Sequence, residues 1–426
     1  MLASIVRNND ALCTFVSGLG LPLSKPQLRH VLNVADALLV TAVHKTLAGL
    51  CRHLLQTADV SNVADTFRIG PWTAEMLLEP LRHWLVARAL ECVRRASAEK
   101  AFLLVSLDDS LIIKDAATTH LEGVDWHYDH NAKCRRRARM QNSFAYLDCH
   151  LSVPGWECTF SLAPYLREKT VRRLNRRRPP KKRLHFVSLP RLARQQLAEL
   201  RRLIPSEIPV YVQCDIWFAS KKLIKYVCRQ GWHVISRIKR NRSFNGQPVT
   251  VCFASPKHRR YEQVTICAAD GAETTYLVRS AVGRLAGLPF DVRVWESRRH
   301  YRDDDPVYFV CTDLALSAQE GLERYARRWQ DEVDHWYLKE RLGLADFRLQ
   351  SYEAIHKYMA VVQLVWAYLQ ERVGQAAGKG ASPAEIIRQH QDEHAESWLR
   401  YFGEEVLRAG AVEPVLQKYL HPVTAT

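Results

Sequence analysis

Residues 101–110 read "AFLLVSLDDS", a short and mostly apolar run that ends in two acids and a serine. A run of this length with apolar residues at successive positions predicts a strand buried on both faces of a sheet. Residues 209–215, "PVYVQCD", repeat the pattern and end in Asp215. In open α/β sheets, ligands bind beyond the carboxyl ends of the strands. We therefore predict an α/β fold that brings acids from two strands to one edge.

The periodicity of apolar residues changes several times before and after these two strands. Before residue 98, apolar residues recur at three- and four-residue spacing, which predicts helices. They could form a DNA-binding helix-turn-helix, although any small helical bundle gives the same pattern. Residues 248–300 hold "VTVCFA", "EQVTICA", "TTYLVRSAV" and "DVRVWES" between turn signals, which predicts a β-rich insertion. The predicted divisions are a helical N-terminal DNA-binding domain (1–98), a catalytic core in two parts (99–247 and 301–375), the β-rich insertion (248–300) and a helical C-terminal tail (376–426).

The composition favours a nucleic-acid partner. The 426 residues include 61 Lys and Arg against 45 Asp and Glu, a formal net charge of +16 on a chain that is 47% hydrophobic. An ordinary core with a large cationic excess is typical of proteins that bind nucleic acid, although a basic surface can also serve solubility alone. Scattered cysteines, no signal peptide and no apolar run long enough for a bilayer predict a cytoplasmic, nucleoid-associated protein.

A third acid is predicted on a helix near the end of the core. Residues 325–339 read "YARRWQDEVDHWYLK". On a helical wheel, at about 100° per residue, most of the aromatic and charged residues fall on one face, and Asp331 and Asp334 lie outside it. The stripe holds Tyr325, Arg328, Trp329, Glu332, Trp336 and Lys339. Taken alone, it could be an ordinary amphipathic helix with an Arg328–Glu332 pair.

Three carboxylates at one place resist ionisation unless a cation separates them. Mg²⁺ prefers oxygen ligands, and two such ions about 3.5–4 Å apart can drive in-line displacement at phosphorus. The order strand-Asp, strand-Asp, β-rich insertion, helix-Glu resembles the cut-and-paste DDE transposases of bacterial insertion sequences, which have an RNase H-like catalytic core. Their signature Y-x2-R-x3-E-x6-K is matched by Tyr325, Arg328, Glu332 and Lys339. The resemblance covers about residues 100 to 375.

The resemblance implies roles for these residues. Asp108, Asp215 and Glu332 would hold two Mg²⁺ or Mn²⁺ ions, and Tyr325, Arg328 and Lys339 would contact the DNA backbone. Neighbouring side chains of a strand point to opposite faces, so either Asp108 or Asp109 fills the first position. Asp108 is favoured because Ser110 follows it by two residues, as Ser or Thr often does in the family.

Three further features have both a functional and a plain structural interpretation. The basic segment 167–183 is predicted to track phosphates, although solvated loops also have this composition; its candidates are Arg172, Arg173, Arg176, Arg177, Arg178, Lys181, Lys182 and Arg183. Trp295 could stack on a flipped base, as an aromatic residue does in related hairpin-forming transposases, or could simply be core. The His and Cys residues of segment 120–158, with His127-x2-His130-x3-Cys134, could hold structural zinc or be solvated polar residues.

The predicted function is a transposase that binds terminal inverted repeats as a dimer, cleaves a strand and transfers it to target DNA. The alternatives are an RNase H-like nuclease or resolvase without strand transfer, and an inert DNA-binding relative. The helix over 352–373 is predicted to cover the catalytic sheet, against which Trp329 and Trp336 are also expected to pack. The tail is expected to begin as a flexible linker and to end in a short helix.

Overall fold

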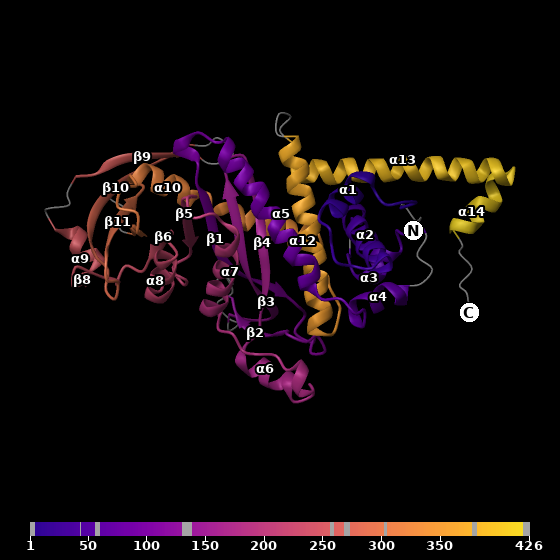
Figure 1. Cartoon of the computed structure of the whole chain (residues 1–426), viewed down its shortest axis with the longest axis horizontal. Helices are drawn as coiled ribbons and strands as arrows, with labels where there is room; N and C mark the ends of the chain where they lie inside the picture. The colour runs from indigo at the N-terminus through magenta and orange to yellow at the C-terminus, as the bar shows by residue number, and fades with distance from the viewer. Residues whose placement is uncertain are drawn as a thin grey trace.

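The computed structural model describes residues 5–42, 44–55, 60–129, 139–255, 260–267, 273–301, 305–376 and 381–420. One large mixed sheet dominates it, with helices on its faces (Figure 1). The strands follow the order β2-β3-β1-β5-β6-β12-β11-β10-β9, with β4 paired to β3. Their bounds are β1 (Leu103–Ile113), β2 (Asp125–Tyr128), β3 (Met140–Val153), β4 (Trp156–Tyr165), β5 (Val210–Cys214), β6 (His233–Ile238), β9 (Glu262–Cys267), β10 (Glu273–Arg284), β11 (Asp291–Arg298) and β12 (Val307–Cys311).

The two acid-bearing strands of the prediction are neighbours in the interior of this sheet. Strand β1 runs antiparallel to β3 and parallel to β5, and β5 runs parallel to β6. All five residues of β5 are buried, as its continuous apolar sequence predicts. The α/β class is therefore confirmed, and the chain's first buried strand is an interior strand of the sheet.

The predicted β-rich insertion extends the same sheet rather than forming a separate one. Strands β9, β10 and β11 pair with one another and join the central strands through β12, which pairs with β6. The expectation of a strand at "VTVCFA" was wrong, because these residues form helix α9 (Val249–Ala254). Val249 and Phe253, four residues apart, are both buried there, which is helical and not strand periodicity. A short hairpin precedes this helix, formed by β7 (Ser243–Phe244) and β8 (Gln247–Pro248).

Every element before β1 in the described N-terminal region is helical. These elements are α1 (Asp10–Gly18), α2 (Lys25–Val40), α3 (Leu47–Cys51), α4 (Val60–Arg68), α5 (Ala74–Arg95) and a short 3-10 turn, Ala98–Lys100. Helix α2 begins with a capping box, in which Ser24 and Gln27 each bond to the other's backbone N–H. The helical periodicity of this region was thus predicted correctly, although a break after Val40 and an additional helix, α4, were not.

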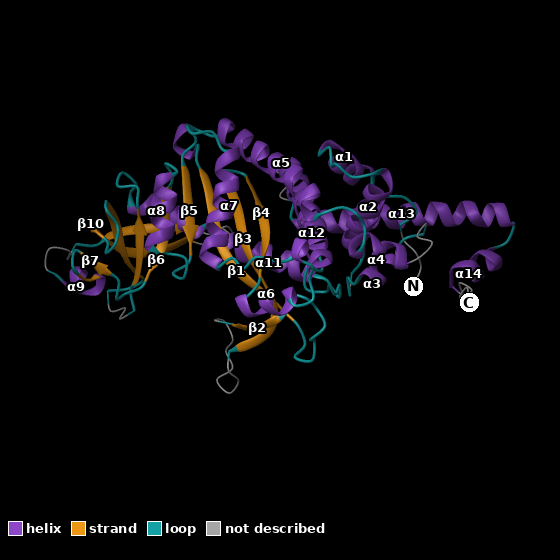
Figure 2. Cartoon of the chain, turned by 60° about the horizontal axis from the view of Figure 1, so that its bottom comes forward, coloured by secondary structure: helices purple, strands orange, loops and turns teal. Residues whose placement is uncertain are grey.

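The remaining helices surround the sheet or follow it. They are α6 (Glu168–Asn175), α7 (Leu189–Leu203), α8 (Lys221–Arg229), α10 (Ala318–Ala326), α11 (Trp329–Trp336), α12 (Tyr352–Gln375), α13 (Pro383–Ala409) and α14 (Val412–Leu420), with a 3-10 turn at Pro180–Lys182 and a π-helical turn, η4 (Tyr337–Arg341). Helix α6 lies near the edge strand β2, in the lower part of the molecule in both views (Figure 1, Figure 2).

Helix α12 covers the sheet, as predicted, and also joins it to the N-terminal helices. It contacts β4 of the sheet and also α2, α4 and α5. Sixteen consecutive or near-consecutive positions between Ala354 and Gln370 are buried, because neighbours surround the helix on all sides. One continuous apolar core therefore runs from α1 through α12 into the sheet.

The C-terminal tail holds a long helix where only a short one was expected. A capping box of Ser382 and Glu385 starts α13, Pro383 occupies its first turn, and Gly410 ends it in the left-handed conformation at φ 69°. The helix passes over the N-terminal helices and projects beyond them (Figure 1). None of the described helices has both the length and the apolarity needed to cross a bilayer.

Candidate active site

The first acids lie in the middle of β1, next to the end of β5. In the parallel pairing Ser106 lies opposite Gln213, and its hydroxyl donates a 3.3 Å hydrogen bond to the Gln213 side chain. Asp108 lies two residues after Ser106 on β1, and Asp215 lies two residues after Gln213, just past the end of β5. Because side chains alternate along a strand, Asp108 shares the face of Ser106 and Asp109 belongs to the opposite face.

The helical segment that carries the signature crosses the Asp108 face of the sheet. Its first helix, α10, starts at a capping box of Ser317 and Glu320. Gln213 donates a 2.5 Å hydrogen bond to the Arg324 carbonyl at the end of α10, which ties the segment to β5. The chain then bends at residues 327–328, continues as α11 and ends in the π-helical turn η4.

The signature residues meet β1 through two direct contacts. Arg328 Nη1 lies 3.2 Å from Asp108 Oδ2, and Arg328 Nη2 lies 3.9 Å from Glu332 Oε1. Lys339 Nζ donates a 2.6 Å hydrogen bond to Ser110 Oγ. Tyr325 packs edge-on against Phe309 of β12, with ring centroids 5.0 Å apart. The segment thus lies over the first strand, with Arg328 between the first and third candidate acids.

Burial and crowding of like charges disfavour ionisation of the strand acids. Burial, followed by the nearby charges of Asp108 and Asp215, raises the pKa of Asp109 to about 6. Burial also raises the pKa of Asp108, although Arg328 opposes the shift. The three candidate acids do not form a closed cage. Among the described residues, the only group of three His, Cys, Asp or Glu side chains with ligand atoms within 4.8 Å of one another lies elsewhere, at Asp36, His390 and His394.

The expectation that Trp329 and Trp336 pack against the sheet was wrong. Their side chains are 66% and 47% exposed, and Glu332 between them is also exposed. The face of α11 that packs on the protein instead carries Asp331, Asp334 and His335, which are buried. The aromatic stripe is therefore available to a ligand, while the acids excluded from it point into the core.

These inward residues form a buried cluster of acids and histidines with β3. His335 Nε2 lies 2.9 Å from Asp148 Oδ2, and His150 Nδ1 lies 3.0 Å from Asp334 Oδ2. Asp334 also accepts a 2.8 Å hydrogen bond from the Trp366 indole of α12. Sequence reasoning missed this cluster, because its members look like surface residues until β3 and α11 are brought together. The one available signal was the spacing of Asp148 and His150, which places both on the same face of a strand.

The zinc interpretation of segment 120–158 finds no support in the described residues. His150 is paired with Asp334 in the cluster above, and adjacent Cys149 faces the other side of β3. His127 is buried in β2, where burial lowers its pKa to about 4. His130 and Cys134 lie outside the described residues. In the part of the chain that is described, no metal-ligand group occurs in this segment.

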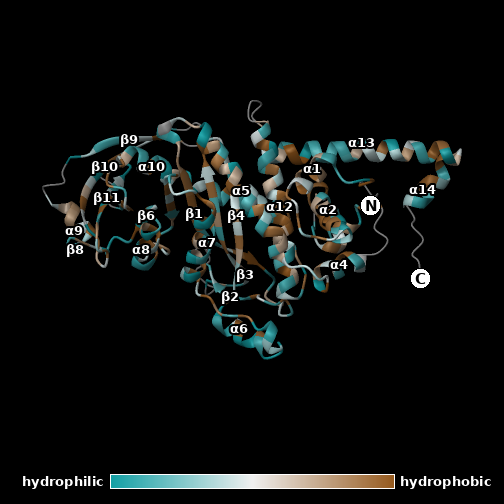
Figure 3. Cartoon of the chain, in the orientation of Figure 1, coloured by the Kyte–Doolittle hydropathy of each residue, from teal (hydrophilic) through white to brown (hydrophobic). Residues whose placement is uncertain are grey.

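The basic segment forms an exposed surface around α6 and the turn that follows it. Figure 3 shows α6 in the teal of hydrophilic residues, beyond the edge of the sheet. The exposed side chains are Arg172, Arg173, Arg176, Arg177, Lys181, Lys182 and Arg183. Arg178 is the exception and corrects the prediction for that residue. Its side chain is 11% exposed and bridges Glu122, at 2.6 Å, and Glu353, at 3.0 Å, so it holds the segment to the body of the protein.

Trp295 is not available for base stacking in this structure. The side chain is completely buried in β11, where it packs against Gly321 of α10. A Cβ atom at Gly321 would come within 2.2 Å of the indole ring, so the glycine is needed for this close approach. The interpretation of Trp295 as a core residue is therefore the one that this structure supports.

Acids thus lie on neighbouring strands of the α/β sheet, and a helical segment places Arg328 against the first of them. Residues 19–264 match the family model described as DDE superfamily endonuclease, and residues 190–368 match the one described as transposase DDE domain. The first match spans more than half of the chain, which therefore belongs to the DDE superfamily of endonucleases and transposases. A search of curated proteins gave no match.

Proposed function

We propose that this protein is a DNA transposase that cleaves and joins strands at the ends of its own insertion sequence. The observation that carries the proposal is the contact of the signature segment with β1, through Arg328 on Asp108 at 3.2 Å and Lys339 on Ser110 at 2.6 Å. These contacts support the proposal because they bring a segment that is far away in the sequence over the strand that carries Asp108. An exposed basic surface around α6 supports DNA as the substrate.

The strand order supports an RNase H-like catalytic core. Its five strands would be the antiparallel β1, β3 and β4, followed by β5 and β6, which run parallel to β1. In that arrangement the first acid belongs to the middle of the central strand and the second follows its parallel neighbour, as Asp108 and Asp215 do.

Asp108, Asp215 and Glu332 are proposed as the ligands of two Mg²⁺ or Mn²⁺ ions. An all-carboxylate set suits these hard cations. Burial first, and then the charges of Asp108 and Asp215, raise the pKa of Asp109, and bound ions would neutralise that local charge. When bound, the ions would activate the attacking oxygen and stabilise the leaving oxygen. Asp108 is preferred over Asp109 because it shares its face with Arg328.

The other signature residues are proposed to hold the scissile strand. Arg328 can make forked contacts to a phosphate, and Lys339 supplies a point charge beside Ser110. Exposed Trp329 and Trp336 offer flat apolar surfaces to bases or sugars next to them. Water and then the freed 3′-hydroxyl would act as successive nucleophiles. Because both ends of the element must be handled together, we propose a DNA-bound homodimer.

The test is strand cleavage of a duplex that carries the inverted repeat flanking the reading frame, in the presence of Mg²⁺. We expect nicking at the repeat tip, and then joining of the cleaved ends to a supercoiled plasmid. Asp215→Asn and Glu332→Gln should each lose cleavage by at least 100-fold while keeping repeat binding in a gel shift. Glu340→Gln, which removes an exposed acid of the same segment, is the matched control and should cleave normally.

Three results would contradict parts of the proposal. Cleavage without joining would indicate a nuclease or resolvase. Specific binding without cleavage by the unaltered protein would indicate an inert DNA-binding relative. Full activity of Asp215→Asn or Glu332→Gln would refute the ligand assignment.

A further inference from the structure

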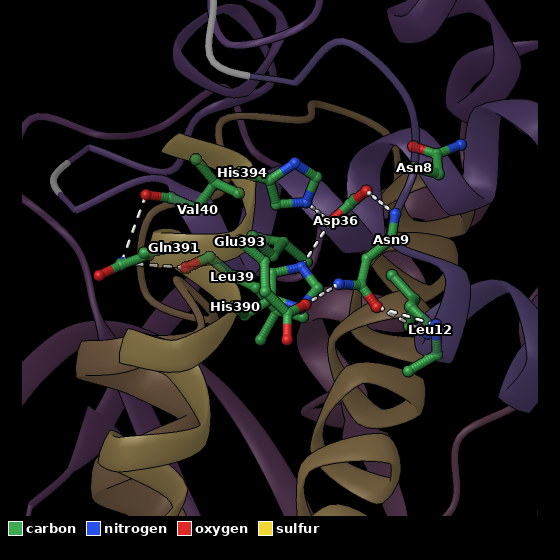
Figure 4. A network of polar contacts seen from close by, with 12 residues as sticks. Asn8, Asn9, Leu12, Asp36, Leu39, Val40, His390, Gln391, Glu393 and His394 are labelled. Carbon is green, nitrogen blue, oxygen red and sulfur yellow. Dashed lines mark hydrogen bonds and ion pairs between the residues drawn. The ribbon is translucent and has the colours of Figure 1, made fainter. Parts of the chain in front are cut away.

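A second polar site lies far from the proposed catalytic acids, where the C-terminal helix α13 meets the N-terminal helix α2. It consists of Asp36 on α2 and of His390 and His394 on α13, which come together although 354 and 358 residues separate them (Figure 4). All three side chains are almost completely buried, with Asp36 at 0%, His390 at 3% and His394 at 4% exposure. Burying three such groups together is costly unless their mutual contacts stabilise them.

The three side chains converge on one point. His390 Nε2 lies 2.5 Å and His394 Nε2 2.8 Å from the same oxygen, Asp36 Oδ1. The second oxygen, Oδ2, accepts a 2.9 Å hydrogen bond from the backbone N–H of Asn9, which fixes the orientation of the carboxylate. The histidines are four residues apart, so one face of α13 directs both rings to Asp36. Within the described part of the chain, this is the only group with a metal-ligand arrangement.

We propose that Asp36, His390 and His394 bind one divalent transition-metal ion of the zinc class. Two imidazole nitrogens and one carboxylate oxygen suit Zn²⁺, whereas Mg²⁺ prefers oxygen ligands. Ligands at about 2.0–2.1 Å around a tetrahedral ion lie roughly 3.3 Å from one another. The present separations are shorter by roughly 0.5–0.8 Å because hydrogens occupy the bridging positions. On metal binding both Nε2–H protons leave to solvent, and each nitrogen donates its lone pair to the ion.

A neighbouring cavity borders the site at His394. It has a volume of about 340 Å³ and is lined by His394 and Asn9 together with Asp10, Glu393 and Glu396. The Asn9 N–H bonded to Asp36 Oδ2 orients this ligand from outside the site. Asn9 Nδ2 also bonds Glu393 at 2.5 Å and Gln391 Nε2 bonds the Leu39 carbonyl at 3.1 Å, and both bonds hold α13 against the N-terminal helices. An ion at this point would link α13 to the N-terminal helices and would be structural rather than catalytic.

The experiment uses the full-length protein, stripped with a chelator and then reloaded with Zn²⁺ in the presence of excess Mg²⁺. Metal content after gel filtration and the absorption spectrum of a Co²⁺-substituted sample report binding and ligand geometry. We expect one zinc per chain, a low-coordinate Co²⁺ spectrum and a rise in Tm on zinc addition. His390→Gln with His394→Gln should lose zinc affinity by roughly 100-fold or more.

Two controls separate this site from others. His83→Gln removes an exposed histidine and should keep the zinc, and Asp215→Asn, altered at the proposed catalytic site, should keep it as well. The proposal would be overturned if the unaltered protein retained no zinc and its Tm did not change on zinc addition. Asp36, His390 and His394 would then only hold the helices together by hydrogen bonds. Stoichiometric zinc in the double histidine variant would also overturn it. The zinc content and the Tm of the unaltered protein test the proposal even if the double variant does not fold.

Discussion

Asp331 carries a carboxylate into the core beside the proposed active site. The residue is 1% exposed, and neither carboxylate oxygen has a hydrogen-bond partner among the described residues. Burial, aided by the charges of Asp148 and Asp108 and opposed by His150, raises its pKa to about 8. An unpartnered buried acid costs stability once it ionises.

Asp331→Asn is therefore expected to stabilise the protein at alkaline pH. In the folded state Asp331 keeps a proton that the unfolded chain, with its ordinary pKa of 3.8, has already released. The unfolding free energy should therefore fall as pH rises from about 4 to about 8. Asparagine removes this dependence, with a gain of about 1–3 kcal/mol near pH 9. Urea unfolding of metal-free protein at pH 6 and pH 9 measures it. Glu332→Gln, an exposed neighbour, is the control, and an unchanged pH slope in Asp331→Asn would refute the expectation.

Asp334→Asn should have the opposite effect. Asp334 pairs with His150 at 3.0 Å and accepts the Trp366 indole N–H at 2.8 Å. Although burial acts against it, Asp334 raises the pKa of His150 to about 10. The pair therefore stabilises the fold fully below about pH 6.5, and this contribution is lost as pH rises through about 10. We expect a loss of about 3–5 kcal/mol at pH 7 in chemical unfolding. Asp392→Asn, on the exposed face of α13, should change little, and an equally small loss in Asp334→Asn would contradict the argument.

At the scale of elements, the sequence predicted the parts that follow from local periodicity. Buried strands β1 and β5 were recognisable because their apolar runs end in acids, and the signature residues because their spacing is fixed. A uniform helical wheel could not reveal the bend at residues 327–328 or the π-helical turn η4, since both depend on tertiary contacts such as Lys339 with Ser110. The inward direction of Asp331 and Asp334 was hidden for the same reason, because their partners on β3 lie far away in the sequence.

The basic segment around α6 makes a prediction from two adjacent arginines. Arg177 is exposed, whereas Arg178 bridges Glu122 and Glu353. Arg177→Ala should weaken DNA binding and lower the salt dependence by about one phosphate contact, with unchanged Tm. Arg178→Ala should instead cost about 1–2 kcal/mol, less than a fully buried pair because both glutamates remain partly exposed.

Fluorescence anisotropy at several salt concentrations and thermal melting distinguish these two roles of the basic segment. The two variants are each other's controls, because they differ by one position and remove the same side chain. If Arg178→Ala affected the salt dependence and Arg177→Ala affected Tm, the assignment of the two residues would be reversed.

At the scale of the whole molecule, the position of α12 decides how independent the N-terminal helices are. Apolar residues of α12 pack against α2, α4 and α5 as well as against β4. Contacts at α13 add to this, because Gln391 bonds the Leu39 carbonyl of α2. The predicted boundary at residue 98 therefore marks a change from helical to strand periodicity in the sequence. A single apolar core extends across this boundary.

A fragment of residues 99–426 is consequently expected not to fold on its own. Removal of residues 1–98 would expose the apolar face that α12 turns to α2, α4 and α5, a patch far larger than soluble proteins leave uncovered. The full-length protein should unfold in one calorimetric transition that includes the N-terminal helices. Circular dichroism and gel filtration of the fragment, with a 5–426 version as the matched control, measure the effect. A soluble, cooperatively melting 99–426 fragment would show instead that the N-terminal helices form a separable DNA-binding domain, since then α12 would need no cover from them.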